Sequence, residues 1–140
     1  MSLELNSLQN GIKSLERAIN VYEKEGKTHA ETTDLMLTLQ AGVIQNFEFT
    51  YELSWKFIKR WLEENISTVA VDGVTRRELF RQGAENKLIV DVEKWMDFHK
   101  SRNFTSHIYD LAIAKEVFAS STEFLPYAKE LLKRLEERNT

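Results

Sequence analysis

The stretch DLMLTLQAGVIQNFEFTYELSWKFIKRWLEEN, residues 34–65, contains no proline and repeats apolar side chains at helical spacing. It predicts one long helix, Asp34 to Asn65, for which Thr32, Thr33 and Asp34 offer N-terminal caps. One apolar stripe consists of Leu37, Ala41, Ile44, Phe47, Tyr51, Trp55, Ile58 and Leu62, and a second of Phe49, Leu53, Phe57 and Trp61. A helix with two apolar faces is either central in its own bundle or packed against a second subunit, and both options stay open.

Helical periodicity continues on both sides of this stretch. The preceding helix is predicted to end near Gly26, and its apolar positions, spaced three and four apart, are Leu5, Leu8, Ile12, Leu15, Ile19 and Tyr22. Residues 67–74 carry a turn signal, Asp-Gly. Thr75 and Glu78 then form a capping box, which predicts a short helix to about Asn86.

The remaining sequence is also helical in pattern. Asp91 is predicted to cap a helix whose apolar positions are Val92, Trp95, Met96 and Phe98. Helical sequence resumes at Leu111 and continues to about Arg138, with a break or kink expected around residues 120–122, because Pro126 lacks a backbone donor. The whole predicts an all-α fold: an up-and-down bundle of four main helices with an extra short helix, as one domain over residues 1–140.

Composition excludes several classes of protein. The 140 residues are 42% hydrophobic and 29% charged, as in a globular chain, and contain no cysteine, so disulfides, thiolate metal sites and cysteine nucleophiles are excluded. The first residues lack a signal-peptide pattern, and no apolar run approaches the roughly 18 residues of a membrane span, so we expect a cytoplasmic protein that does not enter membranes. The net charge of −3 argues against broad nucleic-acid binding. The best basic cluster, Arg76, Arg77, Arg81 and Lys87, is interpreted as a solvated helix face.

Three histidines, His29, His99 and His107, lack the spacing of metal ligands, and no glycine-rich phosphate loop is present. We therefore expect no metal and no cofactor held by this chain. His29 and His99 are interpreted as bystanders.

Residues 100–110, KSRNFTSHIYD, concentrate polar groups of many kinds. In a continuous helix His107 would point about 140° away from Arg102, so either the helix breaks here or other groups complete the site of the histidine. A purely structural reading is also open, in which Arg102 pairs with Asp97 or Asp110 at an ordinary polar helix end.

The pattern Arg102-Asn103-x3-His107-x-Tyr109 resembles the R-x(4–6)-H signature of HEPN domains, in the form found in HepT-like proteins and nucleotidyltransferase substrate-binding proteins. Residues 43–56, VIQNFEFTYELSWK, are similar to a stretch of the same family, and Trp95 also fits. Asn46 departs from the pattern, which has a basic residue there, and this argues against a phosphate contact from the long helix.

The resemblance implies a four-helix bundle that forms homodimers or higher oligomers, with the motifs of two chains facing one cleft. It implies a metal-independent endoribonuclease toxin, with Arg102 and His107 catalytic and Asn103 supporting. The partner would be a minimal nucleotidyltransferase encoded nearby, which acts as antitoxin, supplies the ATP and Mg chemistry and attaches AMP to Tyr109. RNA or a nucleotide would be the ligand.

Two alternatives remain beside this hypothesis. The chain is a non-catalytic substrate-binding subunit of the nucleotidyltransferase, or it is a structural bundle whose motif is vestigial. An open cleft at Arg102 and His107 would argue against the last option, and their burial in separate salt bridges would favour it.

Overall fold

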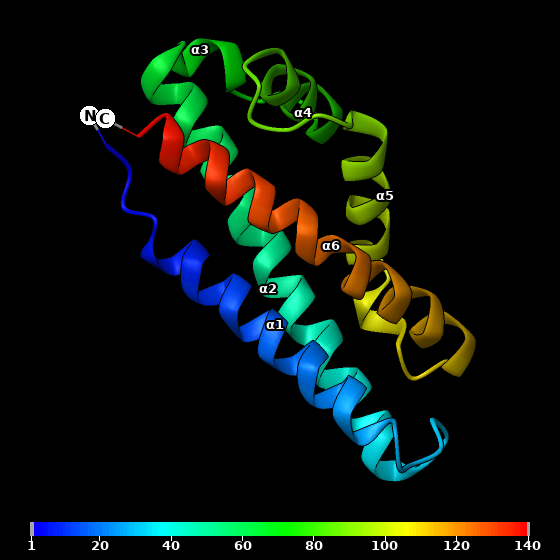
Figure 1. Cartoon of the computed structure of the whole chain (residues 1–140). Coiled ribbons are helices and arrows are strands. Elements are labelled where there is room, and N and C mark those ends of the chain that lie inside the picture. The colour runs from blue at the N-terminus through cyan, green and yellow to red at the C-terminus, as the bar shows by residue number, and fades with distance from the viewer. Residues whose placement is uncertain (1, 140) are drawn as a thin grey trace.

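The computed structural model describes residues 2–139, and within them the chain folds into six α-helices and one 3₁₀ turn, without a strand (Figure 1). The elements are α1 (Asn6–Glu25), α2 (Asp34–Asn65), α3 (Thr68–Val71), α4 (Arg76–Glu85), α5 (Val92–Asn103), η1 (Thr105–His107) and α6 (Leu111–Glu137). The prediction of an all-α bundle is confirmed. Met1 and Thr140, the ends of the predicted domain, lie outside the described residues.

The long helix α2 is the centre of the bundle, since each of the other helices packs against it. The helices α1, α2 and α6 run side by side along the molecule, while α3 and α4 gather at one end and α5 leads back toward the other (Figure 1). The two chain ends meet, because the amide of Asn139 donates to the Leu3 carbonyl at 2.9 Å and its Oδ1 accepts from the Leu3 N–H at 2.6 Å.

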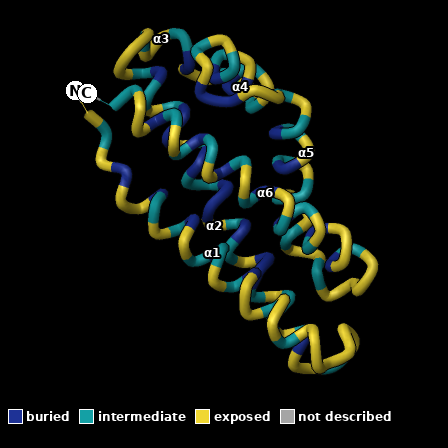
Figure 2. Tube along the Cα trace, viewed as in Figure 1, coloured by how far each residue is buried: buried dark blue, intermediate teal, exposed yellow. Residues whose placement is uncertain are grey.

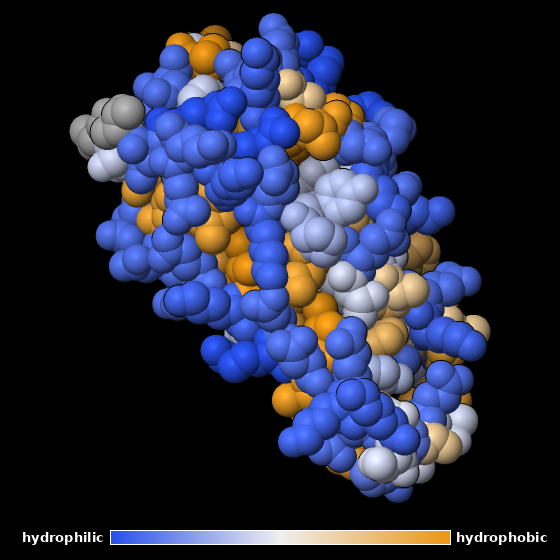
Figure 3. Space-filling view, in the orientation of Figure 1, coloured by the Kyte–Doolittle hydropathy of each residue, from blue (hydrophilic) through white to orange (hydrophobic). Residues whose placement is uncertain are grey.

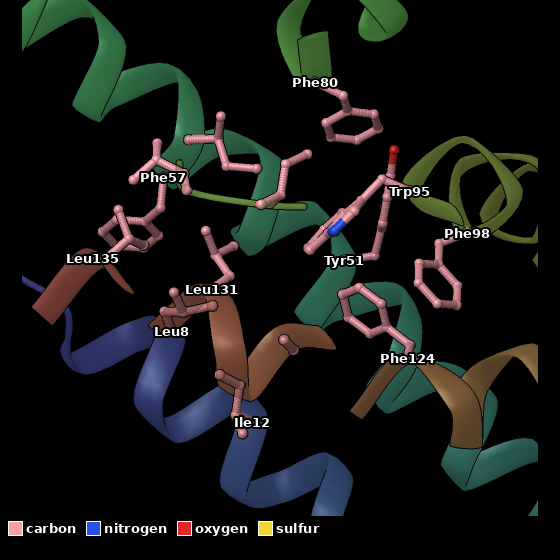
Figure 4. Packing of buried hydrophobic residues seen from close by; sticks show 14 of the residues in the cluster. Leu8, Ile12, Tyr51, Phe57, Phe80, Trp95, Phe98, Phe124, Leu131 and Leu135 are labelled. Carbon is pink, nitrogen blue, oxygen red and sulfur yellow. The ribbon is translucent and has the colours of Figure 1, made fainter. Parts of the chain in front are cut away.

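Aromatic rings from four helices form the middle of the core (Figure 4). The ring of Phe124 on α6 lies 5.3 Å from Phe47, 5.4 Å from Trp95 and 5.0 Å from Phe98, each in an edge-to-face arrangement. Such packing adds to the gain from burying large apolar surfaces. The buried residues recur along the inner sides of the helices and leave the outer sides exposed (Figure 2).

The predicted helix starts are confirmed by side-chain caps. Thr33 accepts from the Met36 N–H at 3.2 Å, Thr75 from the Glu78 N–H at 3.1 Å and Asp91 from the Lys94 N–H at 3.0 Å. Only one half of the capping box at Thr75 is used, because the Glu78 carboxylate pairs with Arg81 instead.

The predicted break before Pro126 is wrong. The helix α6 is continuous through Pro126, because Pro126 lies on the exposed face while the nearby Phe124 and Ala128 are buried and hold the helix against the core. The turn predicted within residues 67–74 is present at Asp72-Gly73, where Gly73 has a φ of +69°, and it follows a four-residue helix, α3, that Ser67 caps. Gly26 does end α1, but with φ −65° it does not adopt the left-handed conformation of a glycine cap.

The second apolar stripe of α2 is mostly covered within the chain. Phe57 is buried, and Leu53 and Trp61 are partly buried against the core, whereas Phe49 stays 54% exposed. The face shown in Figure 3 is largely hydrophilic, with an apolar strip between α1 and α6. No helix among residues 2–139 has both the length and the apolar character needed to cross a membrane. The central position of α2 accounts for both stripes, and a second subunit at Phe49 stays a prediction.

We expect Leu131→Ala to lower the free energy of unfolding by about 2–5 kcal/mol, because the side chain is 1% exposed and its loss leaves a cavity. The matched change Leu35→Ala, at a position 42% exposed, is expected to cost less than about 1 kcal/mol. Urea denaturation followed by circular dichroism measures both values. Equal losses in the two variants would contradict the core described above.

Candidate active site

The motif around residues 101–110 forms the connection between α5 and α6. The helix α5 ends at Asn103, a 3₁₀ turn follows, and Asp110 caps α6 by accepting from the N–H groups of Ala112 and Ile113 at 2.9 and 3.2 Å. The option that the helix breaks is therefore correct. Because of this break, Arg102 and His107 belong to two different elements, and Asp110 is engaged as a cap.

The guanidinium of Arg102 is held by two carboxylates from α2. Its Nε donates to Glu52 Oε1 at 2.8 Å, and its Nη1 lies 3.2 Å from Glu48 Oε2. Glu48 and Glu52 are one helical turn apart, so both point to the same side of α2. The Thr105 hydroxyl completes the arrangement by donating to Glu48 Oε2 at 2.6 Å. Arg102 therefore pairs with neither Asp97 nor Asp110.

This arrangement leaves the arginine accessible to a ligand. The Arg102 side chain is 31% exposed, and within residues 2–139 its Nη2 has no hydrogen-bond partner. Since a guanidinium has five N–H donors, several remain for an anion. A shallow pocket of about 270 Å³ adjoins it, lined by Ala41, Ile44, Gln45, Glu48, Thr105 and Ile108.

His107, Tyr109 and Asn103 are exposed on the same connection. The His107 ring lies 6.4 Å from the ring of Phe104 and 6.1 Å from the ring of Tyr109, between centroids. Tyr109 is 81% exposed. Among the described residues, the side chains of Asn103 and His107 form no hydrogen bond or ion pair. The structure thus fixes Arg102 and presents His107 and Tyr109 to solvent.

A second histidine, which the sequence interpretation set aside, lies one turn before Arg102 on α5. The hydroxyl of buried Tyr51 is 2.8 Å from Nδ1 of His99. Burial raises the pKa of Tyr51, so the phenol stays protonated. Burial, together with the positive charges of Arg76 and Arg102, lowers the pKa of His99, whereas Glu52 opposes this shift. At neutral pH the His99 imidazole is therefore uncharged, and one hydrogen bond joins it to the Tyr51 hydroxyl.

The predicted basic cluster on α4 does not form one solvated face. Arg77 pairs with Glu93, and Arg81 pairs with Glu78 and Glu85 on the surface, as that interpretation requires. Arg76 departs from it, because its guanidinium lies over the ring of Trp55, with the guanidinium carbon 3.4 Å from the ring centroid. The reason is that Arg76 opens α4 where this helix packs on α2, so it points inward.

Two further observations concern a metal site and the position of Asn46, which was discussed above for a phosphate contact. Within residues 2–139, no group of three or more His, Cys, Asp or Glu side chains is placed to hold a metal ion. Asn46 accepts from the Ser14 hydroxyl at 2.5 Å and donates to the Gly42 carbonyl at 2.8 Å, so it joins α1 to α2.

Residues 3–137 match the family model described as nucleotidyltransferase substrate binding protein like. This chain belongs to that family. A curated relative, "Probable ribonuclease HepT" of Haemophilus influenzae, is 36% identical over 138 residues, which cover 98% of this chain and 94% of the relative. The predicted resemblance to the HepT-like branch is confirmed.

Solved structures agree with the family assignment. A Haemophilus influenzae protein, described as having the fold of a substrate binding domain of a nucleotidyltransferase, has a TM-score of 0.88 and 34% identity, covering 95% of this chain and 99% of its own. A Thermus thermophilus protein at 23% identity has a TM-score of 0.63, covering 86% of this chain and 98% of its own, and shares the fold.

Sequence reasoning missed the roles of Glu48, Glu52 and Tyr51. All three lie in the stretch that carries the family resemblance, but their partners are Arg102 and His99, about 50 residues further along the chain. The one signal within the sequence was the spacing of four between Glu48 and Glu52, in a stretch, residues 35–55, that has no other charged side chain.

We expect Arg76→Gln to raise the pKa of His99 and Glu52→Gln to lower it, because the first change removes a nearby positive charge and the second a negative one. NMR titration of the imidazole Cε1–H resonances measures both shifts. Arg77→Gln is the matched control, because this arginine pairs with Glu93 on the surface.

Protonation of His99 also affects the stability of the folded chain. Since folded His99 binds a proton less readily than the unfolded chain, its effect is to reduce the free energy of unfolding as the pH falls below the ordinary histidine pKa. If the pKa of His99 shifts by the same amount and in the same direction in Arg76→Gln, Glu52→Gln and Arg77→Gln, the cluster of Arg76, Glu52 and His99 is contradicted.

Proposed function

We propose that this chain is a HepT-like, metal-independent endoribonuclease, the toxin of a toxin–antitoxin pair, and that it acts as a homodimer in the cytoplasm. The observation that carries the proposal is the contrast within the motif: Arg102 is fixed by Glu48 and Glu52 with donors to spare, and His107, five residues later on η1, is exposed. A purely structural motif would bury both groups in ion pairs. The relative named probable ribonuclease HepT supports the choice of reaction.

The chemistry follows from these residue types. A base removes the proton of the RNA 2′-hydroxyl, the 2′-oxygen attacks phosphorus, and the bond from phosphorus to the 5′-oxygen breaks as an acid protonates that oxygen. The products are a 2′,3′-cyclic phosphate and a 5′-hydroxyl. His107 serves as the base or the acid, and His107 of a second chain supplies the other function, with the two motifs facing one cleft.

Arg102 has the role of stabilising charge. Its free Nη donors are suited to a non-bridging phosphate oxygen, on which negative charge grows in the transition state. Because Glu48 and Glu52 hold the guanidinium, it does not have to reorient when RNA binds. Asn103 supports the pair from the adjacent position on α5.

We expect the purified chain to cleave RNA in the presence of a metal chelator, and His107→Ala to lower the rate at least about 100-fold, because a general acid–base group is lost. Gel analysis of a labelled RNA measures cleavage. His29→Ala is the matched control, since His29 lies between α1 and α2 and bonds to the Glu25 carbonyl. Arg102→Ala is expected to reduce cleavage comparably.

If wild type and His107→Ala cleave equally, or if neither cleaves any RNA, the ribonuclease proposal fails. Mixing wild type with an excess of the His107→Ala chain tests the shared cleft. Mixed dimers hold one His107, so the activity per wild-type chain should fall as the inactive chain is added.

Tyr109 is proposed as the acceptor of AMP from the partner nucleotidyltransferase. Its side chain is 81% exposed and its ring is 6.1 Å from that of His107. A phosphodiester at the phenol oxygen would place bulk and negative charge against the imidazole, which would exclude RNA by sterics and repulsion. In this transfer the Tyr109 phenol oxygen loses its proton and attacks the α-phosphorus of ATP, the bond to the β-phosphate breaks and pyrophosphate leaves. The ATP and Mg belong to the partner enzyme.

We expect a minimal nucleotidyltransferase encoded beside this chain to transfer one or more AMP groups from ATP, detected by mass spectrometry of the intact chain. Tyr109→Phe should abolish the mass gain, and Tyr22→Phe, a half-buried tyrosine on α1, should not. Modification that persists in Tyr109→Phe would contradict the assignment.

A second candidate function is a non-catalytic subunit that presents a substrate to the nucleotidyltransferase. It is favoured by the description of the Haemophilus influenzae structure and by the two carboxylates that already neutralise Arg102. A stable complex with the nucleotidyltransferase, without cleavage of any RNA, would favour this function.

A further inference from the structure

Arg76 is a half-buried cation without a counter-ion. Its Nε is buried and has no hydrogen-bond partner, and within residues 2–139 no carboxylate lies within ion-pair distance of its guanidinium. The nearby Glu52 is already engaged, since its Oε1 accepts from Arg102 and its Oε2 accepts from the Trp55 ring N–H at 2.9 Å. Burial lowers the pKa of Arg76, which reflects the cost of holding this charge away from water.

Among the described residues, Arg76 is the one arginine with a buried side-chain nitrogen that lacks a hydrogen-bond partner. Several of them form ion pairs, which join Arg77 to Glu93, Arg81 to Glu78 and Glu85, Arg102 to Glu48 and Glu52, and Arg134 to Glu130. A chain with net charge −3 has carboxylates to spare, yet none of the described ones is placed against the Arg76 guanidinium. An anionic ligand would supply the missing partner.

A cavity of about 180 Å³ adjoins the arginine. It is lined by Trp55, Lys59, Val71, Gly73, Val74, Arg76 and Leu79. Lys59 adds a second positive charge, and it too forms no ion pair within the described residues. The volume is too small for a whole nucleotide but accommodates a phosphate group.

The cavity and the candidate active site lie along the same face of α2. Glu52, Trp55 and Lys59 lie at positions i, i+3 and i+7 of α2 and so share one face, over about 10 Å of helix. At one end of this face Glu52 contacts Arg102, and toward the other end the Arg76 guanidinium lies over the Trp55 ring.

We propose that Arg76, Lys59 and Trp55 form a phosphate-binding subsite, which holds a second phosphate of the RNA strand whose reacting phosphate is bound at Arg102. The inference rests on the proposed ribonuclease function, to which it adds the path of the strand along α2. The planar guanidinium stays stacked on Trp55 and donates from its edge to phosphate oxygens, while Lys59 contributes a point charge.

The test is the affinity for a single-stranded 2′-O-methyl RNA oligonucleotide, which has no free 2′-hydroxyl and is not cleaved. We expect Arg76→Gln to weaken binding about tenfold and to reduce the slope of affinity against salt by about one, as measured by fluorescence anisotropy. Lys59→Gln should act in the same direction. Arg77→Gln, one residue along α4 and paired with Glu93, is the matched control. Circular dichroism checks that each variant is folded.

The outcomes separate this inference from the proposed function. If Arg76→Gln binds like Arg77→Gln while wild type cleaves RNA and His107→Ala does not, the subsite is wrong and the ribonuclease stands. If Arg76→Gln loses affinity but wild type cleaves no RNA, the subsite stands and the ribonuclease is wrong. If wild type does not bind the oligonucleotide, the subsite is overturned.

Discussion

The ion pairs from Glu48 and Glu52 to Arg102 are the interaction on which the site depends. They tie the last turn of α5 to the central helix α2. The neighbouring positions Phe47 and Tyr51 are fully buried, so the same two turns of α2 build the core and orient the arginine. This coupling explains why the family resemblance spans two distant stretches of sequence: neither stretch can place Arg102 alone.

The same carboxylates would constrain the RNA binding proposed for this site. An incoming phosphate must approach a guanidinium that two negative charges already hold, so attraction at Arg102 is partly offset by repulsion from Glu48 and Glu52. All three side chains are about one-third exposed, and solvent screens both effects. Additional cations are therefore needed along the strand. The unpaired Arg76 and Lys59 on the adjoining part of α2 and α4 would offset this repulsion without weakening the hold on Arg102.

Sequence periodicity was sufficient for the helices, because helix formation and capping are local. The bounds of α2 and the caps at Thr33 and Asp91 follow from residues within a few positions of each other. The site was only partly predictable. Its residues Arg102 and His107 stand out in the sequence, but the partners of Arg102 are about 50 residues away, and the burial of Arg76 is set by Trp55, 21 positions earlier on another helix. Such contacts depend on tertiary packing, which periodicity does not encode.

The two histidines of α5 and η1 differ in how firmly they are held. His99 is oriented by Tyr51 through its Nδ1, and its pKa is lowered, so it is a fixed, uncharged imidazole at neutral pH. His107 is exposed, and no hydrogen bond or ion pair within the described residues holds its side chain. General acid–base catalysis needs the imidazole to be held at the reacting oxygen. The proposed reaction therefore requires the His107 imidazole to be positioned from outside this chain, by the RNA or by a second copy facing it. Attachment of AMP at Tyr109, whose ring lies beside that imidazole, would act on this side chain and leave the clamp at Arg102 intact.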